Sequence, residues 1–287
     1  MTLPQALFLG LLQGATELFP VSSLGHAVIV PTLLSWSYRQ SDPTFLPFLV
    51  LLHLGTAGAL LILYWRQWLA IVAGFFRAAV RGRLDGPDER LAMLLIAGTI
   101  PAGAIGVALQ KQIQVLFAAP RIAAVFLIVN AAVLFGGELI RRRQERGRHL
   151  AGESRVEQEA AFADAEAMSF RAALLIGFFQ AFALVPGISR SGITLTGGLL
   201  AGLRHQEAAR FSFLLATPII GAAGLVEVPE LFSSTAPLAV YAAAALLAGL
   251  AAYASARFLV RYFRSGRLDP YAGYCALAGM AALLLIR

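Results

Sequence analysis

Residues 186–192 read Pro-Gly-Ile-Ser-Arg-Ser-Gly and interrupt an apolar stretch that covers 172–203. A second apolar stretch, 3–36, is interrupted in the same way around Pro20-Val21-Ser22-Ser23. Each half is too short to cross a hydrocarbon core that needs about 20 helical residues. Helix-breaking polar residues at membrane depth are tolerated where the backbone is buried in protein or lines a cavity. The two stretches therefore predict re-entrant pairs of half-helices, each with its tip inside the membrane.

The rest of the chain predicts an all-α polytopic membrane protein. Of its 287 residues, 59% are hydrophobic and 14% are charged, and the mean hydropathy is +0.74, which is too apolar for an ordinary soluble domain. The apolar blocks are long, whereas a membrane β-barrel is built from short segments of alternating hydrophobicity. Six uninterrupted blocks are predicted to span the membrane: 46–65, 91–109, 122–140, 211–228, 238–258 and 271–286. We expect a single membrane domain over residues 1–287.

The basic residues predict how these segments are oriented. Cytoplasmic loops collect arginine and lysine, and 18 of the 23 basic residues fall on one face if neither interrupted stretch crosses the bilayer. This arrangement places both termini outside and inverts residues 171–287 relative to residues 1–140, with a cytoplasmic connector over 141–170. In such inverted repeats, discontinuous helices meet near the midplane and build the site. The formal net charge of +7 reflects these topology signals, so no nucleic-acid partner is expected.

Two charged residues and one histidine fall within the predicted membrane. A charge at the centre of a membrane helix costs about 2.5 to 3.5 kcal/mol on insertion scales, so Glu17 and Arg190 need an explanation. Either they carry function, or they pair with each other simply to hold the two tips together. His53 lies inside the block 46–65, where it either packs through a hydrogen bond or belongs to the site, lining it or supporting it from a second layer.

The second tip has the composition of a phosphate-binding loop. Gly187 and Gly192 allow backbone turns that gather N–H groups in one concavity, and two serines add hydroxyl donors beside the guanidinium of Arg190. These serines are Ser189 and Ser191. A half-helix that begins near Ser191 would direct its positive dipole end to the same point, and arginine matches phosphate oxygens with paired donors. The residues predict a cradle for phosphate.

The first tip supplies candidate catalytic groups. Gln13 and Glu17 are four residues apart and share one face of the first half-helix. Ser22 or Ser23 is placed to cap the second half-helix, and His26 follows one turn after Ser23. A helix N-terminus disfavours the imidazolium, so His26 is expected to stay neutral and available as a base or nucleophile. Capping alone is the other interpretation of the two serines.

Three motifs carry a family resemblance: Gln-Gly-Ala-Thr-Glu-Leu-Phe-Pro-Val-Ser-Ser-Leu-Gly-His at 13–26, His-Leu-Gly-Thr at 53–56, and the motif at 186–192. With them the whole chain resembles the undecaprenyl-diphosphate phosphatases of the bacitracin-resistance (BacA) family. The resemblance implies hydrolysis of undecaprenyl diphosphate to undecaprenyl phosphate and inorganic phosphate, which recycles the lipid carrier for peptidoglycan synthesis and confers bacitracin tolerance. It also implies a bacterial cytoplasmic membrane, a site open to the periplasm, and a divalent cation, Mg²⁺ or Ca²⁺. Gln13 stands where the family often has glutamate, which leaves Glu17 as the carboxylate for that metal.

Two function hypotheses follow. In the first, the protein is a phosphatase that binds the phosphates at the second tip. Either Ser23 or His26 attacks the terminal phosphorus, or His26 activates a water molecule for the attack. Glu17 orients the histidine, binds metal or handles the proton. The second is a transporter or flippase for a phosphorylated lipid carrier or another anion, since anion carriers are also built from broken helices in inverted repeats. A carboxylate in the site favours chemistry. Undecaprenyl diphosphate and membrane lipid are the expected partners, and a homodimer stays open.

Overall fold

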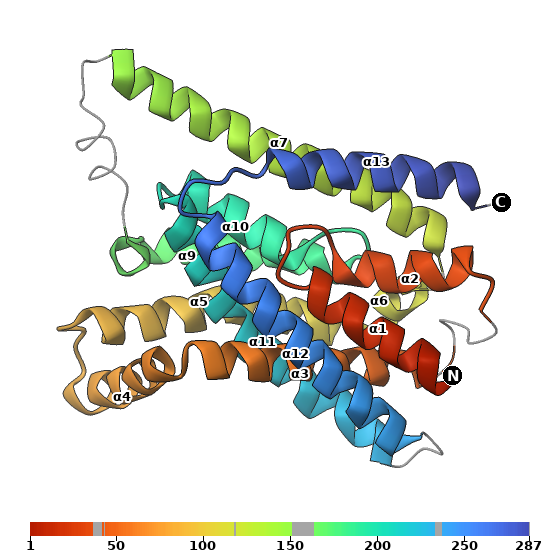
Figure 1. The fold of residues 1–287 in the computed structure, drawn as a ribbon. Coiled ribbons are helices and arrows are strands. Elements are labelled where there is room, and N and C mark those ends of the chain that lie inside the picture. Colours follow the sequence, from red (N-terminus) through yellow and green to blue (C-terminus); the bar gives the residue numbers. More distant parts are fainter. Residues whose placement is uncertain (37–41, 43, 118, 151–163, 233–236, 287) are drawn as a thin grey trace.

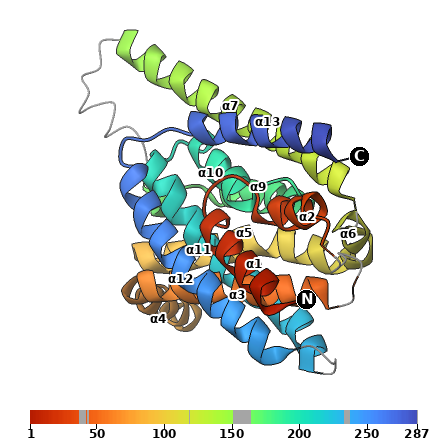
Figure 2. The ribbon, with the colours of Figure 1, turned by 45° about the vertical axis from the view of Figure 1, so that its right-hand side comes forward.

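The computed structural model describes residues 1–36, 42, 44–117, 119–150, 164–232 and 237–286. All regular elements in this part of the chain are helices, bundled with α7 and α13 along one edge and α3, α4 and α12 along the other (Figure 1; Figure 2). In chain order the elements are α1 (Leu3–Thr16), α2 (Ser23–Leu33), α3 (Phe45–Leu63), α4 (Trp65–Arg81), α5 (Pro87–Ala108), α6 (Gln110–Phe117), α7 (Pro120–Leu150), η1 (Ala165–Ala167), α9 (Phe170–Gln180), η2 (Ala181–Leu184), α10 (Arg190–Leu200), α11 (His205–Phe232), α12 (Leu238–Tyr262) and α13 (Asp269–Leu285).

Five of the described helices are long and apolar enough to cross a membrane: α3, α5, α7, α11 and α12. The sixth expected block forms α13, whose 17 residues fall just short of that length. Large apolar side chains face outward, and Leu225 and Leu284 expose 82% and 85% of their surface. Exposed apolar surface of this extent fits contact with lipid. The chain is a multi-pass membrane protein.

Both interrupted stretches break where the sequence predicts. The first forms α1 and α2, and the second forms α9, η2 and α10. Ser22 caps α2 by accepting a hydrogen bond from the Gly25 N–H, and Ser189 caps α10 by accepting one from the Gly192 N–H. In Figure 1 the outer ends of α1 and α2 lie at the end of the bundle that holds both chain termini, and α9 begins near the opposite end. The tips of the two hairpins meet inside the bundle.

Two helices are absent from the sequence prediction. The segment that was expected to be an arginine-rich loop forms α4, which buries Ile71, Gly74 and Ala78 while Phe76 and Val80 stay exposed. Its apolar run, residues 68–76, is much shorter than the about 20 residues of a membrane span, so the sequence did not mark it as a block. The other helix, α6, is a single short helix between α5 and α7.

The expected connector over 141–170 is only partly described by the structure. Its first residues continue α7 as far as Leu150, and its last part contains η1. Residues 151–163 lie outside the described part of the chain.

Small residues bring α3 and α12 close together. On α12, Ala244, Ala248, Ala252 and Ala256 recur every four residues and are fully buried, so they form one continuous face. Such a face allows neighbouring backbones to approach closely. A Cβ atom at Gly55 of α3 would lie 2.1 Å from the carbonyl oxygen of Ala245. This contact fixes the position of α3, the helix that carries His53.

Replacing Gly55 with alanine is expected to lower the midpoint of thermal unfolding in detergent, because the added methyl group overlaps a backbone oxygen. Overpacking of this kind destabilises by about 1 to 3 kcal/mol. Gly58→Ala is the matched control in the same helix, since a Cβ atom there meets nothing within 4 Å. Alanine also raises helix propensity over glycine by up to about 1 kcal/mol. Equal midpoints for the two variants would contradict the packing described here.

Candidate active site

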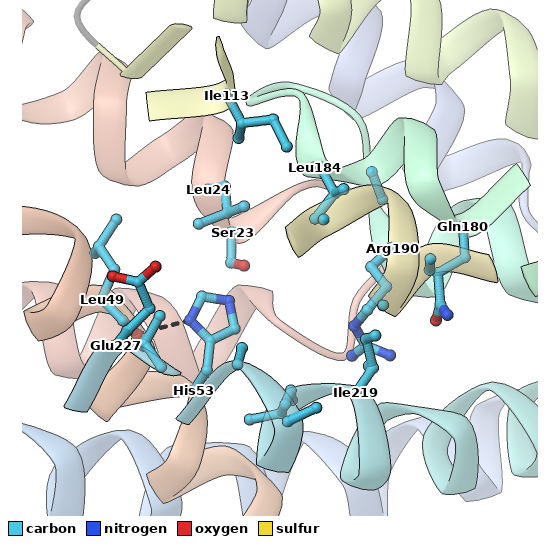
Figure 3. Close-up of a pocket in the computed structure, with 18 of the residues that line it drawn as sticks. Ser23, Leu24, Leu49, His53, Ile113, Gln180, Leu184, Arg190, Ile219 and Glu227 are labelled. Carbon is cyan, nitrogen blue, oxygen red and sulfur yellow. Dashed lines mark hydrogen bonds between the residues drawn. The ribbon is translucent and has the colours of Figure 1, made fainter. Parts of the chain in front are cut away.

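A cavity of about 240 Å³ lies between the two hairpin tips and helices α3, α5 and α11. Figure 3 shows Ser23, His53 and Arg190 around it. Most of the wall is aliphatic, with side chains that include Leu46, Leu49, Val107, Leu184, Ile219 and Val226. Binding pockets commonly combine an apolar wall with a few polar groups that fix the ligand's orientation. The cavity therefore suits a ligand with a polar head and an apolar tail.

Glu17 is at the centre of the polar end of the cavity. Its Oε1 accepts a hydrogen bond from Nη2 of Arg190 at 2.8 Å. Its Oε2 accepts hydrogen bonds from Nε2 of Gln13 at 2.8 Å and from the hydroxyl of Ser23. His53 Nε2 lies 3.1 Å from the same oxygen. The structure thus brings groups from the first tip, the second tip and α3 to one point.

The pair of Glu17 and Arg190 is largely removed from solvent, since their side chains are 3% and 14% exposed. Truncating one partner of a buried pair leaves an uncompensated charge and destabilises by about 3 to 5 kcal/mol. Nη1 of Arg190 also donates to the carbonyl oxygen of Ser212 at 3.5 Å. A guanidinium carries more N–H donors than these contacts use, so Arg190 can also donate to a ligand in the cavity.

His53 contacts the acid directly. Its Nδ1 lies 2.7 Å from the carbonyl oxygen of Leu49, which can only accept, so Nδ1 carries a hydrogen. Its Nε2 faces Oε2 of Glu17, and an ionised carboxylate can likewise only accept. A proton therefore lies between His53 and Glu17. Of the positions that the sequence left open for His53, the structure shows the one in which it lines the cavity and contacts the acid.

The two tips interlock through serine hydroxyls. Oγ of Ser22 accepts from the Gly187 N–H at 3.1 Å and donates to the Ile188 carbonyl at 3.1 Å. Oγ of Ser191 donates to the carbonyl oxygen of Glu17 at 3.2 Å. These contacts join residues that are more than 160 positions apart in the chain.

The phosphate cradle expected at the second tip is only partly open to the cavity. The N–H groups of Gly187 and Gly192 already donate to serine hydroxyls, and Ser191 points toward the first tip. A Cβ atom at Gly187, where φ is +105°, would lie 2.2 Å from the carbonyl oxygen of Ala123, so the backbone there packs against α7. Of the cradle residues, Ser189 and Arg190 line the cavity.

His26 does not reach this cavity. Ser22, Ser23 and Leu24 from the same turn line it, but the His26 ring lies against α13. Its Nδ1 is 2.7 Å from the carbonyl oxygen of Ser22, and its Nε2 is 2.7 Å from the hydroxyl of Tyr274. The rings of His26 and Tyr274 are stacked, with centroids 5.7 Å apart and planes inclined by 11°.

Two polar residues beside the tips were not singled out from the sequence. Asn130 of α7 is fully buried, and it donates to the Pro20 carbonyl at 3.0 Å while accepting from the Ser189 N–H at 3.0 Å. It therefore contacts both tips. Glu227 of α11 is a second carboxylate in the cavity wall. Each is a polar residue inside an otherwise apolar block, which is the signal that could have found them.

Known proteins place this chain in a family. The family model for the bacitracin resistance protein BacA matches residues 6–281. The chain belongs to the BacA family. A protein of Acidiphilium cryptum (strain JF-5) named undecaprenyl-diphosphatase is 48% identical over 98% of this chain and 97% of its own length. Proteins named undecaprenyl-diphosphatase in Mycobacterium avium (strain 104) and undecaprenyl-diphosphatase 2 in Chromobacterium violaceum are 45% and 44% identical, over 98% of this chain in each case and 96% and 97% of their own lengths.

The side chains that the structure describes do not form a metal site by themselves. Within the described ranges, no three His, Cys, Asp or Glu side chains lie close enough together to hold a metal ion. Both oxygens of Glu17 are already engaged by donors. Mg²⁺ and Ca²⁺ require several oxygen ligands. This donor set does not fit a resident divalent cation.

Proposed function

We propose that this BacA family member hydrolyses undecaprenyl diphosphate to undecaprenyl phosphate and inorganic phosphate. Relatives that match over nearly their full lengths are named undecaprenyl-diphosphatases. The observation that carries the proposal is the contact of Ser23 and Arg190 with Glu17 at the polar end of an otherwise aliphatic cavity. The diphosphate head of the substrate would lie at the polar end of the cavity, and its prenyl chain would lie along the aliphatic wall. The reaction recycles the lipid carrier for peptidoglycan synthesis and confers tolerance to bacitracin.

In this proposal Ser23 is the nucleophile. It lines the cavity and its hydroxyl donates to Glu17, so Glu17 can take the proton as Oγ attacks the terminal phosphorus. The bond between that phosphorus and the bridging oxygen breaks, and undecaprenyl phosphate leaves. Water then attacks the phosphoserine, and Glu17 returns its proton to Oγ of Ser23 as the bond between Oγ and phosphorus breaks. Both protons of the water leave with inorganic phosphate.

Arg190 and Ser189 bind the phosphates in this scheme. Both line the cavity, and a guanidinium can stabilise the charge that develops on the transferred phosphoryl group. His53 shares a proton with Glu17 and holds its Oε2 beside Ser23. The divalent cation expected from the family resemblance would enter bound to the diphosphate oxygens, since the protein donors do not hold it alone.

We also infer the membrane topology expected from the arginine distribution. It has six spans, the sixth being α13, and two inverted repeats, each beginning with a re-entrant hairpin. Support comes from the two hairpins, whose outer ends lie toward opposite ends of the bundle in Figure 1. The arginine-poor end holds both termini, and this supports a periplasmic position for the termini and for the opening of the site. A homodimer stays a prediction.

A carrier function is not favoured. A carrier for an anion gains nothing from a buried carboxylate that accepts the hydroxyl of a serine in the binding cavity. That contact serves bond cleavage, because it prepares the serine as a nucleophile.

The test is phosphate release by the purified protein in detergent. We expect release of inorganic phosphate from undecaprenyl diphosphate, at the same rate in the Gly58→Ala protein, whose substitution touches neither the cavity nor a neighbour. Assays with and without a chelator measure the contribution of the cation. Absence of phosphate release in detergent, together with movement of the lipid across sealed vesicles, would overturn the proposal in favour of a carrier.

A further inference from the structure

Ser22 has a strained backbone at the centre of the site. Its φ is +66°, and it is one of two non-glycine residues with positive φ in the described part of the chain. Non-glycine residues in this conformation cost about 1 to 3 kcal/mol and persist only where their surroundings hold them. Ser22 immediately precedes Ser23, so the direction of the Ser22 backbone sets where the Ser23 hydroxyl points.

His26 bonds the Ser22 carbonyl twice, through its backbone N–H at 3.2 Å and through its ring. The carbonyl oxygen can only accept, so the contact at 2.7 Å requires a hydrogen on Nδ1 of His26. In the neutral ring Nε2 is then an acceptor, and the Tyr274 hydroxyl is 2.7 Å away to donate to it. Both ring nitrogens are thus engaged, and the residue is 7% exposed. The ring is fixed between Ser22 and α13.

Ser22 also contacts the second tip directly through its hydroxyl. Its hydroxyl bonds both the Gly187 N–H and the Ile188 carbonyl, which lie just before Ser189 and Arg190. Movement of the Ser22 peptide would therefore displace the nucleophile on one tip and the phosphate-binding residues on the other.

We propose that His26 is a positioning residue that acts through Ser22. It clamps the strained peptide so that Ser23 stays on Glu17 and the two tips stay in register, and it touches neither substrate nor reacting atoms. This inference rests on the proposed function. It assigns to His26 a role different from the base or nucleophile that the sequence alone suggests, because the ring lies outside the cavity and both of its nitrogens are occupied.

Three substitutions at one position separate the roles. Asparagine places an amide N–H near the position of Nδ1 and can keep the side-chain bond to the Ser22 carbonyl. Glutamine and alanine lose that side-chain bond and keep only the bond from the backbone N–H of residue 26. We expect His26→Asn to keep kcat within about fivefold of wild type, and His26→Gln and His26→Ala to lower kcat by about 10- to 100-fold at unchanged KM, since misplacement of about 1 Å has effects of this size. We expect His26→Asn to keep the wild-type pH profile of kcat. A base or nucleophile cannot be replaced by an amide, so equal loss in all three variants would overturn the proposal.

Two measurements on the wild-type protein test the same proposal without any substitution. Quenching turnover of a substrate labelled in its terminal phosphate should trap no phosphohistidine, and phosphohistidine at His26 would overturn the proposal. Nitrogen NMR of labelled histidine should show His26 as the neutral ring with its hydrogen on Nδ1, and a hydrogen on Nε2 instead would overturn it even in a protein that released no phosphate. Loss of phosphate release in the wild type is a separate result, which counts against the proposed function.

Discussion

Arg190→Ala is expected to lower kcat/KM for undecaprenyl diphosphate by about 10³- to 10⁵-fold, the range seen when an arginine that stabilises a transferred phosphoryl group is removed. The side chain lines the cavity and bonds Oε1 of Glu17 at 2.8 Å, so the substitution removes a phosphate donor and disturbs the acid. Arg190→Lys keeps the charge but not the paired, planar donors, and we expect it to stay at least about tenfold below wild type. Phosphate release in detergent measures both effects.

Loss of activity at Arg190 must be separated from loss of the fold, because Arg190→Ala leaves Glu17 buried without its partner. The control is the double variant Glu17→Gln with Arg190→Met, which removes both charges at similar volume. Such neutral replacement of a buried pair is often tolerated, so we expect a midpoint of thermal unfolding close to wild type with no turnover. Near-normal turnover in Arg190→Ala would remove Arg190 from the mechanism.

Ser23→Ala and Glu17→Gln are each expected to lower kcat by about 10²- to 10⁴-fold, because the first removes the nucleophile and the second removes the group that takes its proton. Since both act in one step, we expect the double variant to be no slower than the slower single variant. The same phosphate-release assay gives all three rates. Wild-type protein quenched during turnover should contain phosphoserine, and Ser23→Ala should not.

Additive losses in the double variant would show that Glu17 and Ser23 act in separate steps. A wild-type protein that traps no phosphoserine but turns over normally would point to direct attack by water. In that case Glu17 would act on the water, and Ser23 would bind the phosphate.

The parts of the fold that follow from local chemistry were predictable. Proline, glycine and serine that cluster in an apolar stretch favour a helix end, and both hairpins break at such residues. Two charges at membrane depth need partners, and Glu17 and Arg190 do pair. The amphipathic helix α4 was not predicted, because its apolar run, residues 68–76, is too short for a membrane span.

The parts of the site that depend on contacts between distant residues were not predictable. The N–H of Gly187 was expected to bind phosphate, but a serine hydroxyl from the other tip accepts it. His26 was expected beside Ser23, but its ring lies against α13 and contacts the hydroxyl of Tyr274. The backbone of the first tip turns at Ser22, whose φ is positive. Asn130 bonds both tips from a helix that the sequence shows only as an apolar block. None of these partners can be read from spacing along the chain.

The interlocked tips restrict what motions are compatible with turnover. The acid and the serine belong to one hairpin and the guanidinium to the other, and the bonds of Ser22 to Gly187 and Ile188 join the two. Any rocking of one half of the protein against the other, as in alternating access, would pull these groups apart. Cleavage of the diphosphate and passage of a lipid between leaflets would then require different conformations, and one molecule could not do both at the same moment.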